Sequence, residues 1–225
     1  MYQSLLRGIV AGALAFVVTA APALAAETII VGFGGGLTGR LAYYDNQTRN
    51  GAQMAVDEIN AAGGIAGKYK IDLRVKDVLS ETVGSAAAGK EFVAAGVKVM
   101  IAPCDRDLAI AFSGPARQAD IPIIAPCAST PTLAVETAPS MFQIYPSDNL
   151  QAAALATYAR EQGYGTAYIL MSADTPSGQK LPLYFEDAFE KMGGKVASEG
   201  LYIQGQQDFG AQTTSIRNLR PRPDV

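Results

Sequence analysis

Short apolar runs alternate along the chain with longer stretches in which apolar residues recur every three or four positions. The runs predict buried strands over residues 28–32, 71–76, 97–102, 121–125, 142–145, 166–171 and 195–203. Between them, patterns such as Ala52, Ala55, Val56 and Ile59 predict helices that turn one apolar face inward. Because strand and helix alternate strictly, we predict an α/β fold whose parallel sheets are covered by helices.

Residues 97–134 contain the same sequence pattern twice. Each half has an apolar run, a Pro-Cys pair that ends in Cys104 or Cys127, and a polar turn suited to begin a helix. In open parallel sheets, ligands bind outside the carboxyl ends of the strands, where helix N–H groups point at anionic groups. Residues 105–107 and 128–130 are therefore the first candidates for a ligand-contacting surface.

A glycine-rich segment follows the first predicted strand. Gly34, Gly36 and Gly39 satisfy the G-x-G-x-x-G pattern of dinucleotide-binding folds. That pattern needs an acidic residue about 20 positions later, at the end of the second strand. The count from Gly39 ends at Glu58 or Ile59, inside a predicted helix. We therefore interpret the glycines as a tight backbone turn against a ligand or a neighbouring loop, and expect no cofactor.

Residues 1–25 have the architecture of a secretory signal peptide. A short start with Arg7 precedes an apolar core over residues 9–19, and Ala23-Leu24-Ala25 provides the small residues for cleavage after Ala25. The apolar core is shorter than the ~20 residues that a membrane span needs. We therefore expect a cleaved leader and a mature protein in the periplasm.

The composition excludes several functional classes. The 225 residues contain no histidine, which removes Ser-His-Asp catalysis and His-ligated zinc. The 18 Lys and Arg residues form no run or stripe and stand beside 21 Asp and Glu, so nucleic acid is not an expected partner. No G-x-S-x-G, no H-E-x-x-H and no metal-ligand spacing occurs. We therefore expect no catalytic residues and no metal ligands.

The alternation of strand and helix restarts at residues 146–149, which we interpret as a crossover between two domains. The chain then divides into a signal peptide over residues 1–25, a first domain over 26–146 and a second over 147–225. Only two strands are predicted after the crossover, and an independently stable sheet usually needs three or more. We expect the second domain to be incomplete and loosely ordered beyond Tyr145.

Four segments carry a family resemblance: residues 36–39 (Gly-Leu-Thr-Gly), 51–67, 121–126 and 174–178. With them the sequence resembles the type I periplasmic binding proteins, in particular the Leu/Ile/Val-binding branch that serves ABC importers. The resemblance implies two Rossmann-like lobes joined by hinge strands, with a ligand between them and the second lobe incomplete.

The resemblance also implies a function. The chain would be the solute-binding component of an ABC importer and not an enzyme. It would bind a small polar ligand, such as an amino acid or a related amide or organic acid, as a monomer, and would deliver it to a membrane permease. The alternatives are a ligand-sensing module of the same fold and, disfavoured because catalytic motifs are missing, an exported enzyme.

Position by position, the resemblance implies ligand contacts. Ser129 matches a residue whose hydroxyl and N–H hold a ligand carboxylate, Cys127 lies where a backbone carbonyl receives an ammonium group, and Tyr44 matches an aromatic pocket wall. Two positions depart from the family pattern, since Asp105 stands where amino-acid binders have serine and Ser177 where many relatives have an aromatic residue. The candidate ligand-binding residues are Tyr44, Cys104, Asp105, Arg106, Cys127, Ala128, Ser129 and Ser177.

The carboxylate of Asp105 would repel a ligand carboxylate bound nearby. Either Arg106 turns inward to take that carboxylate, or the ligand presents an ammonium, amide or hydroxyl group there. Asp105 is also suited to cap the helix that begins at Arg106, and one residue can do both. Ser129, followed by Thr130 and Pro131, likewise reads as a helix cap with an additional ligand contact.

Cys104 and Cys127 are the only cysteines, and they lie at equivalent ends of strands that we expect to be neighbours. An oxidising compartment permits a disulfide between them, which needs Cα atoms about 4.4–6.8 Å apart. Two small buried thiols are the alternative, and the sequence leaves both open.

We predict that the mature protein begins at Ala26 or Glu27, because the leader has the features that signal peptidase recognises. N-terminal sequencing of protein recovered from the periplasm checks this prediction. A mature chain that still contains Arg7 would contradict it.

Overall fold

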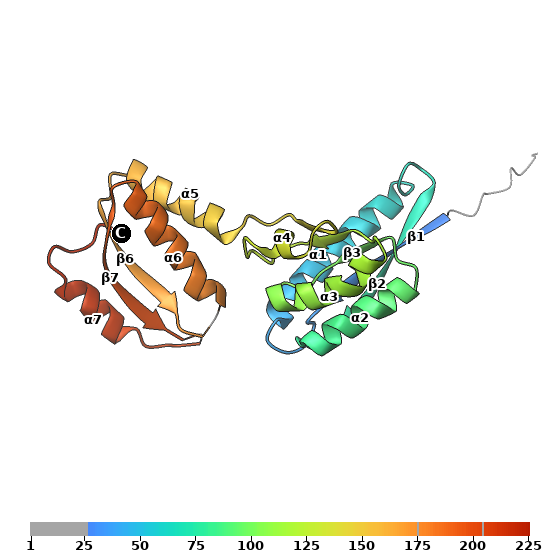
Figure 1. The fold of residues 1–225 in the computed structure, drawn as a ribbon, viewed down its shortest axis with the longest axis horizontal. Helices are drawn as coiled ribbons and strands as arrows, with labels where there is room; N and C mark the ends of the chain where they lie inside the picture. The colour runs from blue at the N-terminus through green and yellow to red at the C-terminus, as the bar shows by residue number, and fades with distance from the viewer. Residues whose placement is uncertain (1–26, 175, 204) are drawn as a thin grey trace, which may run out of the picture.

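A five-stranded parallel sheet organises the amino-terminal part of the chain (Figure 1). The computed structural model describes residues 27–174, 176–203 and 205–225, without the side chains of Pro176 and Ser177. The predicted signal peptide therefore lies outside the described residues. Within the part that is described, no helix has both the length and the apolar character that crossing a membrane requires.

The sheet and its helices follow the predicted alternation. The strands are β1 (Glu27–Gly35), β2 (Tyr69–Asp77), β3 (Val99–Ile101), β4 (Ile123–Ala125) and β5 (Met141–Gln143). They pair in parallel in the order β2-β1-β3-β4-β5. The helices are α1 (Ala42–Ala61), α2 (Thr82–Ala94), α3 (Arg106–Gln118) and α4 (Leu133–Glu136). After β4 the Ser129 cap predicts a helix that begins near Pro131, whereas the structure has the four-residue α4 from Leu133, which is too short to show a helical period.

One row of buried residues runs straight across the sheet and explains why the strands are apolar. Gly32, Met100, Ile123 and Met141 are direct neighbours on β1, β3, β4 and β5. All four are buried, and the last three belong to the main core together with residues of α2 and α3. Burial of such side chains is the main stabilising term of the fold.

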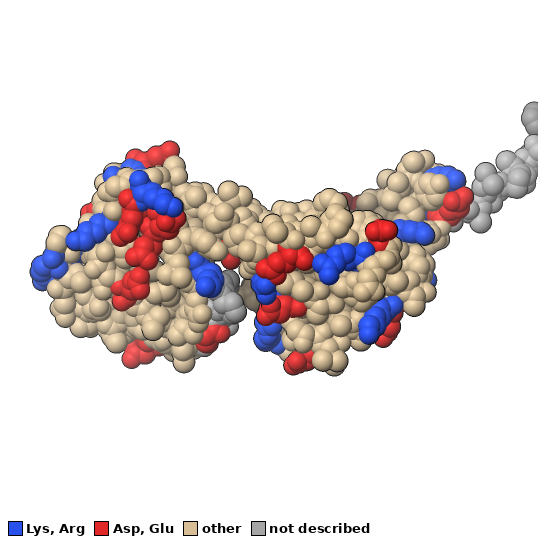
Figure 2. Space-filling model, viewed as in Figure 1, with Lys and Arg blue, Asp and Glu red and all other residues tan. Residues whose placement is uncertain are grey.

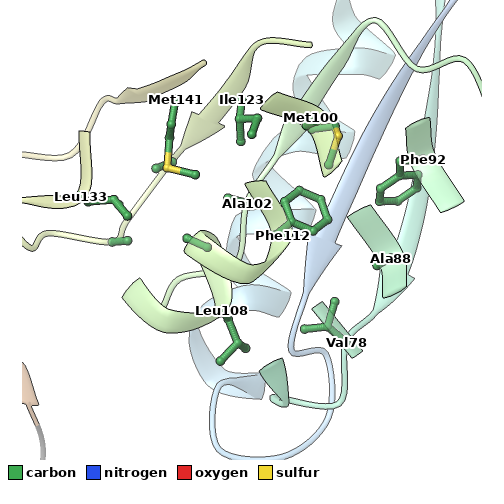
Figure 3. Close-up of a cluster of buried hydrophobic side chains, with 14 of the residues drawn as sticks. Val78, Ala88, Phe92, Met100, Ala102, Leu108, Phe112, Ile123, Leu133 and Met141 are labelled. Carbon is green, nitrogen blue, oxygen red and sulfur yellow. The ribbon is translucent and has the colours of Figure 1, made fainter. Parts of the chain in front are cut away.

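Two phenylalanine rings join α2 and α3 in this core. The rings of Phe92 and Phe112 meet edge to face, with centroids 6.0 Å apart (Figure 3). Both lie directly over β1, which glycine makes possible. A Cβ atom added at Gly32 would lie 2.8 Å from Phe92 Cγ, and one added at Gly34 would contact Phe112 still more closely.

The glycine-rich segment therefore differs from its prediction. β1 does not end at Gly32 but continues to Gly35, so Gly34 lies in a strand and not in a turn. The lack of a side chain serves close packing of rings on the strand, a use of glycine that local sequence does not distinguish from a turn. Only Gly36 and Gly39 lie in the turn, and Gly39 has a φ of +80°.

Residues 148–225 contain a second, two-stranded parallel sheet. β6 (Thr166–Ser172) pairs with β7 (Lys195–Tyr202), and the other elements are α5 (Asp148–Glu161), α6 (Pro176–Lys191) and α7 (Gly210–Asn218). Phe189 is fully buried and forms the centre of a small core with alanines of α5 and β6. The two predicted strands of this part are confirmed, and looser order beyond Tyr145 stays a prediction.

We expect Gly34→Ala to destabilise the protein by about 1–3 kcal/mol, because the added methyl group would force the buried Phe112 ring to move. Urea unfolding measures the change. Gly51→Ala is the control, since nothing lies within 4 Å of its Cβ position, and alanine in a helix interior should be neutral or stabilise slightly. Equal stability of the two variants would show that the core accommodates the methyl group.

Candidate ligand-binding site

The chain moves outward in both directions from β1 and β3, to β2 on one side and to β4 and β5 on the other. In open parallel sheets, ligands bind at such a switch point, outside the carboxyl ends of the strands. The loops that follow the strands here are residues 36–41 after β1, 102–105 after β3 and 126–132 after β4. We call these three loops the carboxyl edge and take it as the candidate site.

A buried carboxylate joins the first two loops of the carboxyl edge. Asp45, in the first turn of α1, has no exposed surface. Its Oδ2 accepts the N–H of Gly36 at 2.6 Å, and its Oδ1 accepts the N–H of Cys104 at 2.9 Å. The start of α1 therefore fixes the ends of β1 and β3 relative to each other.

Burial raises the pKa of Asp45 above its usual 3.8, although the N–H groups of Cys104 and Gly36 oppose the rise. The nearby charge of Asp105 raises this pKa as well, and that of Arg40 lowers it. Because the folded protein holds this proton more tightly than the unfolded chain, Asp45 favours folding at low pH. That contribution is lost as the pH rises from about 3.8 through the raised pKa.

The turn after β1 is also held from the end of β2. Asp77 accepts the N–H of Leu37 at 2.9 Å and the hydroxyl of Thr38 at 2.7 Å, and the Ser80 hydroxyl donates to the Thr38 carbonyl. Burial opposes the charged form of Asp77, but the hydrogen bonds from Thr38 and neighbouring N–H groups outweigh it and lower its pKa. The turn that carries Arg40 is therefore fixed by several bonds.

A disulfide joins the loops after β3 and β4. Cys104 and Cys127 are bonded, and their Cα atoms lie 5.0 Å apart, inside the range that a disulfide requires. The hydroxyl of Thr48 lies 3.4 Å from Cys104 Sγ. Of the two alternatives left open by the sequence, the structure contains the disulfide, and all three loops of the carboxyl edge are thereby linked.

One group of potential metal ligands lies among the described residues. It consists of a carboxylate oxygen of Asp45 and the sulfurs of Cys104 and Cys127, all within 4.8 Å of one another. Each donor is already engaged, because the sulfurs bond to each other and both carboxylate oxygens accept N–H groups. In this state the group offers no free ligand to a metal ion.

Asp105 uses both of its carboxylate oxygens. Oδ1 accepts the N–H groups of Asp107 and Leu108, each at 3.0 Å, which confirms that Asp105 caps α3. Oδ2 forms an ion pair with Nη2 of Arg40 at 2.9 Å. The pair spans the switch point, since Arg40 follows β1 and Asp105 follows β3.

Arg106 does not turn inward in this structure, and the prediction that it takes a ligand carboxylate stays a prediction. Its guanidinium pairs with Asp107 and with Glu136 of α4, and this pairing holds the pKa of Glu136 below its usual range. The guanidinium of Arg106 is thus neutralised by Asp107 and Glu136. Arg40, which the sequence did not single out, is the residue that neutralises Asp105.

The loop after β4 leaves polar groups unpaired. The Ser129 hydroxyl is half-buried and makes no hydrogen bond to any described residue, and the Cys127 carbonyl accepts none from them. Ala128 is buried, and its carbonyl accepts a bond from Gln143 Nε2 at 3.0 Å. Thr132 is the N-cap of α4, without a side-chain cap, so the prediction that Ser129 caps a helix is wrong.

Tyr44 lies in the first turn of α1 and is 52% exposed. Its ring meets that of Tyr43 edge to face, with centroids 5.3 Å apart. Its carbonyl accepts the hydroxyl of Thr48, the residue beside Cys104, so Tyr44 is close to the carboxyl edge. The side chain of Ser177, the remaining candidate, lies outside the described residues.

Sequence reasoning missed Arg40 and Asp45. Asp45 lies seven positions before Ala52 and eleven before Val56, which places it on the inward stripe of α1. An acidic residue on a buried stripe is a signal of a structural carboxylate, and it was available in the sequence. No comparable signal marks Arg40, whose partner is 65 positions away.

A family model described as periplasmic binding protein matches residues 28–222. This chain belongs to the periplasmic binding protein family. The resemblance drawn from residues 36–39 and 51–67 is thereby confirmed. The expected Rossmann-like α/β architecture is confirmed as well, by the parallel sheets and by the likeness to solved structures of this family.

Two curated relatives of this periplasmic binding protein are Leu/Ile/Val-binding proteins by name. BraC3 of Rhizobium johnstonii is 29% identical over 195 residues, which are 87% of this chain and 53% of BraC3. Homolog 3 of Brucella melitensis is 27% identical over 190 residues, which are 84% of this chain and 51% of the relative. The chain thus spans about half the length of the curated relatives it matches.

Solved structures of substrate-binding proteins have the same fold. LivJ of Streptococcus pneumoniae, in complex with isoleucine, is 28% identical with a TM-score of 0.73, and the match covers 86% of this chain and 55% of LivJ. A Desulfitobacterium hafniense protein in complex with Leu is 26% identical with a TM-score of 0.69, over 85% of this chain and 56% of that one. A Rhodopseudomonas palustris protein with 3,4-dihydroxybenzoic acid, 22% identical with a TM-score of 0.72 over 88% and 53%, shows the likeness of fold alone.

We expect Asp45→Ala to destabilise this binding protein, because the N–H groups of Gly36 and Cys104 would lose their acceptor at a cost of about 1–3 kcal/mol each. Urea unfolding at pH 7 measures the loss. Asp57→Ala is the control, since Asp57 is exposed on the same helix and should change stability by less than about 0.5 kcal/mol. Equal effects of the two substitutions would show that Asp45 does not hold the loops.

We predict that denatured, unreduced protein contains no free thiol, because Cys104 and Cys127 are joined and are the only cysteines. A thiol-reactive dye, with a reduced sample as the control, measures the number. Two reactive thiols per chain in protein isolated from an oxidising compartment would contradict the disulfide.

Proposed function

We propose that this chain is a solute-binding component of an ABC importer and that it binds a small polar ligand at the carboxyl edge. The observation that carries the proposal is the Ser129 hydroxyl in the loop after β4, which has no hydrogen-bond partner among the described residues. The neighbouring Cys127 carbonyl likewise accepts no bond from them. A half-buried donor next to an acceptor, in the place where such sheets bind ligands, suits a small molecule with both kinds of group.

The ligand that we propose is an amino acid or a related amide or organic acid. Two structures with 28% and 26% identity to this chain hold isoleucine and leucine. On this chain, the hydroxyl and N–H of Ser129 would hold the carboxylate, the Cys127 carbonyl would accept the ammonium group, and Tyr44 would cover the apolar part. The ligand would leave unchanged, so the chain is proposed not to be an enzyme.

The two sheets correspond to two proposed lobes, residues 26–146 and 147–225, that close on the ligand. Closure turns contacts on both lobes into affinity and gives a permease a shape to recognise. We propose that the protein is exported by its leader, acts in the periplasm as a monomer and delivers its ligand to an ABC permease. Membership of a periplasmic binding protein family supports this location and this partner.

We expect Ser129→Ala to weaken binding of L-leucine by about 1–3 kcal/mol, the value of a hydrogen bond to a charged group. Titration of the ¹⁵N-labelled chain, followed by amide shifts, measures the dissociation constant even when binding is weak and shows where the ligand binds. Ser198→Ala is the control, since Ser198 is a half-buried serine of β7 without a side-chain hydrogen bond to the described residues.

Two results would contradict this proposal. One is an amide shift pattern that leaves residues 126–132 unaffected while leucine and its analogues bind elsewhere. The other is equal affinity of the Ser129→Ala variant and wild type, which would remove the hydroxyl from the site.

A further inference from the structure

The charge of the carboxyl edge is concentrated in one ion pair. Nη2 of Arg40 lies 2.9 Å from Oδ2 of Asp105 and joins the turn after β1 to the loop after β3. Figure 2 shows both signs of charge distributed over the face of the molecule in view. The carboxylates of Asp45 and Asp77 also contact these loops, but their oxygens accept backbone N–H groups of the loops themselves. Of the charged side chains that contact or belong to the loops, the pair therefore contains the one with donors left for a small ligand, Arg40.

The two members of the pair differ in their freedom to meet a ligand. The side chain of Asp105 is 18% exposed, and its oxygens are already engaged by the N-terminus of α3 and by Arg40. The side chain of Arg40 is 59% exposed, and its bond to Asp105 is the one hydrogen bond that it makes to the described residues. A guanidinium carries five N–H donors, so Arg40 keeps donors for a second anion.

The turn that carries Arg40 is held by hydrogen bonds, so the backbone of Arg40 has a fixed position at the carboxyl edge. Asp77 binds the turn through Leu37 and Thr38, and the Ser80 hydroxyl accepts the N–H of Leu41, the residue after Arg40. Asp105 is fixed as the cap of α3. An arginine held between two anchored loops loses less conformational entropy when it binds a ligand than one on a mobile loop.

We propose that Arg40 determines which charge class of ligand the site accepts. Its free donors bind an anionic group of the ligand, and its charge cancels the repulsion that Asp105 would otherwise exert on that group. Arg40 thereby fills the role that the sequence had offered to Arg106. The inference rests on the function proposed above and adds a specificity-determining residue to it.

The charge balance of the edge gives the direction of each effect. With both residues present, the pair is neutral and leaves donors free for an anion. Without Arg40, the charge of Asp105 repels anions and attracts cations, whereas without the charge of Asp105, Arg40 attracts anions more strongly. The exposure of Arg40 lets solvent screen these effects, so we expect changes of about tenfold, equivalent to about 1.4 kcal/mol.

The experiment compares three probes with one carbon skeleton: isocaproate, isocaproamide and isohexylamine, which are anionic, neutral and cationic at pH 7. Dissociation constants are measured from amide shifts for wild type, Arg40→Gln, Asp105→Asn and the double variant. Asparagine is as good an N-cap as aspartate, so Asp105→Asn removes the charge and keeps the cap of α3. Arg74→Gln is the matched control, an exposed arginine whose ion pair with Asp72 lies on β2 and outside the loops of the carboxyl edge.

We expect wild type to prefer isocaproate over isohexylamine, Arg40→Gln to lose about tenfold for isocaproate and to favour the amine, and Asp105→Asn to shift the preference the other way. In the double variant the two shifts should largely cancel, and Arg74→Gln should behave as wild type. Thermal unfolding confirms that each variant is folded.

The inference is overturned if wild type binds the probes at the carboxyl edge but the preference does not change with Arg40→Gln, or changes equally with Arg74→Gln. That result would leave the proposed function intact. Probes that bind wild type only away from residues 36–41, 102–105 and 126–132 would instead contradict the proposed function, and this inference with it.

Discussion

The carboxylate of Asp45 lies out of contact with solvent and accepts one N–H from the loop after β1 and one from the loop after β3. An ionised group is costly to bury unless donors compensate for its lost water. Here two backbone donors do so, and they come from the loops after the two strands that flank the switch point. The requirement to satisfy this one carboxylate therefore sets the spacing of the loops that would face a ligand.

The packing of the core fixes the position of α3, which carries the other charged residue of the carboxyl edge, Asp105. Glycines in β1 let the rings of Phe92 and Phe112 lie directly over the strand, so that α2 and α3 approach the sheet closely. The position of α3 in turn places its N-cap, Asp105, within reach of Arg40. The same tight contact that stabilises the core thus aligns a charged pair at the carboxyl edge.

The amino-acid pattern predicts much of this fold because periodicity reports burial. The strict alternation of apolar runs and helical stretches indicated the parallel sheets, and the Pro-Cys repeat marked two loops that the structure joins through Cys104 and Cys127. Two kinds of feature escaped prediction. Glycine in β1 has the same local signature whether it turns the chain or accommodates a ring. The partner of Arg40 is set by tertiary packing over 65 positions, which no local pattern records. Asp45 was also missed, but it could have been predicted, because its position on the inward stripe of α1 indicates a buried carboxylate.

The disulfide closes a ring of chain between positions 23 residues apart, and this ring contains the whole of α3. A cross-link over a loop of this size lowers the entropy of the unfolded chain by an amount worth about 3 kcal/mol. The disulfide also uncouples the opening of α3 from the separation of the strand ends that it joins. If α3 opens transiently and exchanges its amide hydrogens, Cys104 and Cys127 still hold the ends of β3 and β4 together. Local unfolding of this helix can therefore occur while the loops after β3 and β4 stay next to each other. The disulfide thus preserves the arrangement of these two loops of the carboxyl edge.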